Sequence, residues 1–109
     1  MYIIKITEPA ERDIQDAVNY IARELKNRTA AIRLLDDVDG AIYSLEKMPS
    51  RHALVHDEVL AGRGIRFFPV HNYLVFYVIR EETGMVVIER FLHARRDWIS
   101  ILRGKNESE

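Results

Sequence analysis

Apolar residues recur at helical spacing in two segments near the start of the chain, residues 10–25 and 31–45. Each segment has one apolar stripe and one charged face, which is typical of helices that pack on a core. Residues 26–29 form a short connection, so we expect the two helices to fold back as an antiparallel hairpin. Thr7 can cap the first helix, and Pro49 ends the second because it disfavours helical geometry in the residue before it.

Four apolar runs predict β-strands. They are residues 2–6, 64–68, 73–79 and 85–92. The last three are joined by short turn-like links, so they should pair as antiparallel neighbours. The order β-α-α-β-β-β predicts an α+β fold in which the helical hairpin packs on one face of a mainly antiparallel sheet, followed by a short C-terminal helix. We expect a single domain over residues 1–103 and a polar tail over 104–109.

The alternation within the strands predicts which side chains meet the helices. We expect Ile65 and Phe67 to face the hairpin, which turns Arg66 and Phe68 outward. In the last strand we expect Val86, Ile88 and Leu92 to face inward and Val87, Glu89, Phe91 and His93 to face outward. An outer face with so many apolar residues would be a contact surface for a partner chain.

The richest chemistry follows the last strand, where His93, Arg95 and Arg96 come in quick succession before Asp97 and Trp98. A strand end holds such side chains rigidly and leaves them open to solvent, which favours an anion or phosphate site. Asp97 is predicted to cap the last helix, with Trp98 on its packing face.

Composition narrows the possible functions. The net charge is −1, which argues against holding nucleic acid by bulk charge, although eight of the nine basic residues after position 50 are arginine. The chain has no cysteine, and the His52/His56 pair falls in an irregular segment, so the sequence implies no metal site and no cofactor. The N-terminal apolar run is too short for a signal peptide or a membrane span, and we expect a soluble cytoplasmic protein with no membrane contact.

Several features form one pattern: the order of elements, the segment Tyr20–Ala22, the Leu45-x-x-x-Pro49 helix end, the Arg66 strand, the aromatic strand 73–77 and above all Leu92-His93-x-Arg95-Arg96-Asp97. In this pattern the chain resembles the RelE/ParE superfamily of bacterial type II toxins. The resemblance covers roughly residues 1–102. It implies a growth-inhibiting toxin neutralised by a cognate antitoxin, with which it would form a hetero-oligomer.

The superfamily contains two mechanisms. RelE-like members cleave messenger RNA on the ribosome, a reaction that needs a proton acceptor, a phosphate-binding cation and a proton donor. In this chain the resemblance would make His93 the acid or the base, and Arg66 with Arg95 or Arg96 would hold the phosphate. ParE-like members bind and poison DNA gyrase, which requires a recognition surface and no catalytic set. The low charge, the scarcity of lysine and the His-x-Arg-Arg-Asp ending favour the gyrase mechanism, with the ribonuclease as the alternative.

The predicted contact residues for target or antitoxin come from the outer sheet face and the strand end. They are Arg66, Phe68, Tyr77, Val87, Phe91, His93, Arg95, Arg96 and Trp98. Several have simpler explanations: Arg66 as a solvent-facing strand residue, His93 as a packed histidine, and Tyr73 and Tyr77 as core or stacking residues on one strand face.

Overall fold

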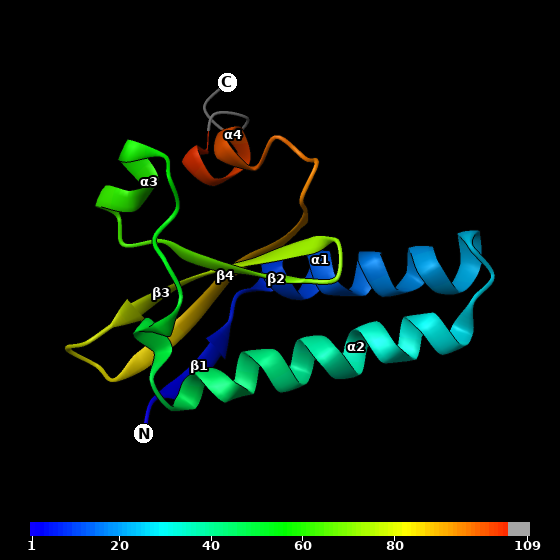
Figure 1. The fold of residues 1–109 in the computed structure, drawn as a ribbon, viewed down its shortest axis with the longest axis horizontal. Coiled ribbons are helices and arrows are strands. Elements are labelled where there is room, and N and C mark those ends of the chain that lie inside the picture. Colours follow the sequence, from blue (N-terminus) through cyan, green and yellow to red (C-terminus); the bar gives the residue numbers. More distant parts are fainter. Residues whose placement is uncertain (105–109) are drawn as a thin grey trace.

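A helical hairpin covers one face of a four-stranded sheet, as the computed structural model of residues 1–104 shows (Figure 1). The first arm is α1 (Glu8–Asn19), extended by the π-helical turn η1 (Tyr20–Glu24), and the second is α2 (Arg28–Tyr43). The hairpin is confirmed. The Thr7 side chain accepts a hydrogen bond from the Ala10 N–H at 3.1 Å, which confirms the predicted helix cap.

The sheet has the order β1-β4-β3-β2, so the first and last strands lie side by side. Its strands are β1 (Ile3–Ile6), β2 (Arg66–Val70), β3 (Tyr73–Arg80) and β4 (Met85–His93). β1 runs parallel to β4, and the other pairs are antiparallel. The mainly antiparallel sheet and the α+β class are therefore confirmed.

The second sheet face is also covered, and here the sequence-based expectation was wrong. Two short helices, α3 (Glu58–Gly62) and α4 (Trp98–Arg103), lie across the sheet from the hairpin (Figure 1). They enclose a second core cluster, built on Val55, Leu60, Ile65, Phe76, Val78 and Leu92. Asp97 accepts a hydrogen bond from the Ser100 N–H at 3.3 Å, which confirms it as the cap of α4. Of the predicted polar tail, residues 105–109 lie outside the described part of the chain.

The facing of β2 is the reverse of the predicted one. Phe68 and Val70 belong to the core under the hairpin, and Ile65 belongs to the cluster under α3 and α4, with Phe67 packed against it. Both faces of the strand are apolar because both are buried. The alternation therefore shows which residues share a face, without showing which face meets the hairpin.

In β4 the facing changes within the strand because of a β-bulge. Tyr77 pairs with Ile88, but its neighbour Phe76 pairs with Arg90, so Glu89 is an extra residue on β4. Val86 and Ile88 face the hairpin as predicted. After the bulge the pattern is inverted: Phe91 packs under the hairpin and Leu92 packs in the opposite cluster, contrary to the expectation.

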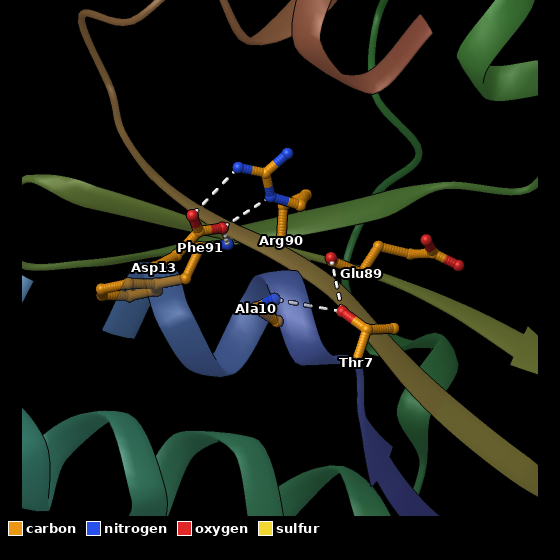
Figure 2. Close-up of polar contacts among 6 residues, drawn as sticks. All are labelled: Thr7, Ala10, Asp13, Glu89, Arg90 and Phe91. Atoms are coloured by element: carbon orange, nitrogen blue, oxygen red, sulfur yellow. Dashed lines mark hydrogen bonds and ion pairs between the residues drawn. The ribbon is translucent and has the colours of Figure 1, made fainter. Parts of the chain in front are cut away.

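Side chains at the start of α1 hold this bulge in place (Figure 2). The Thr7 hydroxyl donates to the Glu89 carbonyl at 2.9 Å. The Asp13 carboxylate accepts from the Arg90 guanidinium at 2.6 and 2.9 Å and from the Phe91 N–H at 3.0 Å. The paired register of β1 and β4 ends at Ile6 and Ile88, so Asp13 gives the Phe91 N–H an acceptor beyond the end of β1.

Candidate functional site

His93 ends β4 on the hairpin side of the sheet, directly opposite Tyr73 of β3. The two rings meet edge to face with centroids 5.3 Å apart, and Tyr73 also stacks on Phe91 at 4.8 Å. The His93 Nδ1 accepts a hydrogen bond from the Arg95 N–H at 3.1 Å, and its carbonyl accepts one from the Arg96 N–H at 2.9 Å. The turn after β4 thus fixes the imidazole with its Nε2 left for another partner.

An open pocket of about 320 Å³ lies between this strand end and α1. It is lined by Asp13, Asp16, Ala17, Tyr20, Tyr73, Phe91, Leu92, His93 and Arg96. Burial, with a further contribution from Tyr20, raises the pKa of Tyr73 above its ordinary value, so its phenol is a protonated donor at neutral pH. The pocket therefore combines hydrogen-bond donors, carboxylates and flat rings, a set suited to recognising a polar partner group.

Arg95 and Arg96 are both exposed in the turn that follows β4. Within residues 1–104, neither guanidinium makes a hydrogen bond or an ion pair with another side chain. Both are available to bind a carboxylate or phosphate, the use for which arginine geometry is suited.

Arg66 lies at the start of β2, whereas His93 lies at the end of β4. It pairs with Tyr77, whereas His93 pairs with Tyr73. Four residues of strand separate these pairs, or about 13 Å along the strands, in addition to about 10 Å across the two strand spacings. The Arg66 guanidinium donates to the carbonyls of His52 at 2.6 Å and Ser50 at 3.4 Å, so it holds the loop before α3. The structure does not bring Arg66 together with His93 and Arg95.

Several predicted contact residues belong to the interior. Phe68, Tyr77 and Phe91 are 5% exposed or less, and the Tyr77 hydroxyl donates to the Pro49 carbonyl. The expectation that Phe68 and Phe91 face outward was wrong, because the reversed facing of β2 and the bulge of β4 turn both under the hairpin. Val87 and Trp98 are half-buried against the α4 side, with the Trp98 ring 5.2 Å from that of Phe76.

Sequence reasoning missed the part of the pocket that α1 supplies. Asp13, Asp16 and Tyr20 recur at spacings of three and four residues, which places them on one side of the apolar stripe. That pattern could have shown a polar row on the helix, but nothing in it shows that the row meets the end of β4. Tyr73 was noted only as a core or stacking residue.

Among the described residues, no group of three or more His, Asp or Glu side chains is arranged to hold a metal ion. No helix of the described chain has the length and apolarity required to cross a membrane.

Comparison with known proteins identifies the family. The family model for the ParE toxin of the type II toxin–antitoxin system parDE matches residues 4–98. A comparison with curated protein sequences gives no significant match.

Three solved structures have the same fold. The chromosomal ParDE toxin–antitoxin system from P. aeruginosa matches with a TM-score of 0.69 and 17% identity, covering 85% of this chain and 96% of that one. The RelBE2 toxin–antitoxin complex of Mycobacterium tuberculosis gives 0.61 and 24%, covering 84% and 96%. The isolated E. coli RelE toxin gives 0.59 and 12%, covering 98% and 99%.

Proposed function

Because the chain belongs to the ParE toxin family and is a type II toxin, we propose that it arrests growth in the cytoplasm by binding DNA gyrase through the end of β4. The observation that carries this proposal is the separation of Arg66 from His93. The backbone positions of the two residues are about 13 Å apart along the strands, and the Arg66 guanidinium donates to the His52 and Ser50 carbonyls, so it is not turned to a phosphate beside the imidazole. A binding poison needs no such catalytic set.

The proposed gyrase contact is the exposed turn with Arg95 and Arg96 and the adjoining pocket with His93. The two guanidiniums project from a rigid strand end and are open to a partner, and the pocket offers the Tyr73 phenol and the His93 Nε2 beside them. Phe68, Tyr77 and Phe91 are buried, and we leave them out of the contact surface.

We also propose that a cognate antitoxin binds this toxin in a hetero-oligomer. The ParDE and RelBE2 structures of the same fold are toxin–antitoxin systems. We expect expression of this chain alone to be toxic, and co-expression of an acidic protein from the neighbouring gene to restore growth.

The ribonuclease remains the second candidate because His93, Arg96 and Tyr73 line one pocket. An imidazole, a guanidinium and a phenol are groups that RNA cleavage could use without Arg66. Two parallel reactions with the purified toxin separate the candidates: supercoiling by purified gyrase, and translation on ribosomes with primer extension along the message.

We expect loss of supercoiling with intact message. The R95A/R96A variant should need an at least about tenfold higher concentration for half-inhibition, because a hydrogen bond to a charged group contributes about 1.5–3 kcal/mol. R33A/R80A, which removes two exposed arginines that belong neither to the turn after β4 nor to the pocket lining, is the matched control and should inhibit like the parent. Message cleavage with gyrase unaffected would refute the gyrase proposal, and full inhibition by R95A/R96A would remove those arginines from the site.

A further inference from the structure

The outward side of α2 carries an apolar centre between two opposite charges. Ile32 is 59% exposed and Leu35 is 38% exposed, although both lie in the middle of the helix. Arg28 stands toward the start of α2 and Asp39 toward its end, and both are exposed. At 3.6 residues per turn the four side chains fall within an arc of about 60°, so they form one stripe beside the buried one. We call these four residues the α2 stripe.

The α2 stripe is symmetric in a way that suits pairing with itself. Ile32 and Leu35 are equally distant from the midpoint between residues 33 and 34, and so are Arg28 and Asp39. When two copies of the helix lie antiparallel about this point, each Ile32 meets a Leu35 and each Arg28 meets an Asp39. Such self-complementarity is what a two-fold interface requires, because the same patch contacts itself.

The charges beyond the stripe continue the pattern. An open groove of about 640 Å³ lies beside Asp39 and is lined from α1 by Glu8, Glu11 and Arg12, so carboxylates outnumber cations there. The tip of the hairpin carries Arg23, Lys26 and Arg28 against one carboxylate, Glu24. Antiparallel pairing places the basic tip of each copy at the acidic groove of the other. Within residues 1–104, neither Arg28 nor Asp39 makes an ion pair.

We propose that the α2 stripe binds the α2 stripe of a second copy of this chain, forming a two-fold dimer in which the hairpins pack antiparallel. This self-association goes beyond the toxin function and uses a surface separate from the end of β4. The hairpin extends past the edge of the sheet (Figure 1), and all four residues of the α2 stripe are exposed.

Charge reversal tests this arrangement directly. We expect purified parent chain to show a concentration-dependent monomer–dimer equilibrium in sedimentation equilibrium. R28D and D39R should each weaken the dimer at least about tenfold, because each places like charges opposite one another at both ends of the interface. Both positions are exposed and each variant keeps the apolar centre, so both should fold with the parent circular dichroism spectrum. In R28D the acidic residue at the first position of α2 also favours the helix.

Mixing the two variants is the decisive measurement. R28D has Asp at both positions and D39R has Arg at both, so an equimolar mixture should form heterodimers with every pair complementary, and the double variant R28D/D39R should recover the parent affinity. R33D reverses an exposed arginine on another side of α2 and should leave the dimer unchanged. Failure of the mixture to dimerise when the parent does would overturn the antiparallel register.

A parent chain that stays monomeric at all concentrations would overturn self-association. If D39R then also weakened binding of the antitoxin from the neighbouring gene, the stripe would belong to the antitoxin and not to a second copy.

Discussion

Replacing Asp13 by alanine tests how the bulge of β4 is held. The Asp13 carboxylate accepts two hydrogen bonds from the Arg90 guanidinium and one from the Phe91 N–H (Figure 2). Its side chain is 12% exposed and that of Arg90 is 24% exposed, so the pair is largely shielded from water. Asp13→Ala removes all three hydrogen bonds. The partly buried Arg90 guanidinium then loses this carboxylate, and the Phe91 N–H loses this acceptor.

The expected loss of stability is about 3 kcal/mol. Breaking a buried ion pair by removing one partner costs about 3–5 kcal/mol, because the remaining charge loses its compensation. Arg90 keeps some exposure to water and has further interactions, which places the loss at the lower end of that range. For a domain of this size such a loss lowers the melting temperature by roughly 10–20 °C.

Urea unfolding followed by circular dichroism measures this loss. With a slope of about 1.5 kcal/mol per molar, the midpoint should fall by about 2 M. Asp16→Ala is the matched control, because Asp16 is an exposed aspartate on the same helix and no ion pair joins it to another residue of the described chain. The control should stay within about 0.5 kcal/mol of the parent. Equal stability of the two variants would refute the assignment of the bulge to Asp13.

Two other substitutions probe the loop before α3, which contains Pro49 and His52. Tyr77→Phe should lower the unfolding free energy by about 1–3 kcal/mol, because it leaves the Pro49 carbonyl without its donor. The control is Tyr43→Phe, which alters an exposed tyrosine and should have no measurable effect in the same urea series. Burial, and then the nearby Arg51 charge, lower the pKa of His52, so the unfolded chain binds a proton more readily than the folded one. The unfolding free energy should therefore fall as pH decreases below about 6.5, and His52→Gln should reduce this dependence on pH. The same dependence in parent and variant between pH 7.5 and 5.5 would contradict the role of His52.

Local patterns in the sequence were sufficient to predict the hairpin, the four strands, the C-terminal helix and their order. The hairpin, the cap at Thr7 and the cap at Asp97 depend on neighbours within a few residues, and all three are confirmed. The strand predicted at residues 64–68 lies two residues later, because β2 (Arg66–Val70) continues through Pro69. The helix α3 was missed because five residues make too few turns to show periodicity, and the predicted C-terminal helix gave no sign that it covers the second sheet face. Without that cover, an apolar sheet face looks like a surface for a partner.

Predicting the site from the sequence was harder, because it depends on which strand ends meet. Arg66 and His93 both lie on the hairpin side of the sheet, yet the register places Arg66 opposite Tyr77 and His93 opposite Tyr73, four residues apart on β3. No local pattern contains that register. The same holds for the approach of α1 to the end of β4, which brings Asp16 and Tyr20 beside His93.

The bulge at Glu89 explains both the wrong facing and the location of the pocket. With strict alternation from Ile88, residues 90 and 92 would face the hairpin, and His93 would point toward α4. The extra residue inverts the pattern, so Phe91 and His93 face α1, where His93 meets Tyr73 and lines the pocket. Thr7 and Asp13 hold the bulge from the same helix that supplies Asp16 and Tyr20. One helix therefore both sets the direction of the imidazole and supplies the opposite wall of its pocket, which makes the bulge part of the functional site.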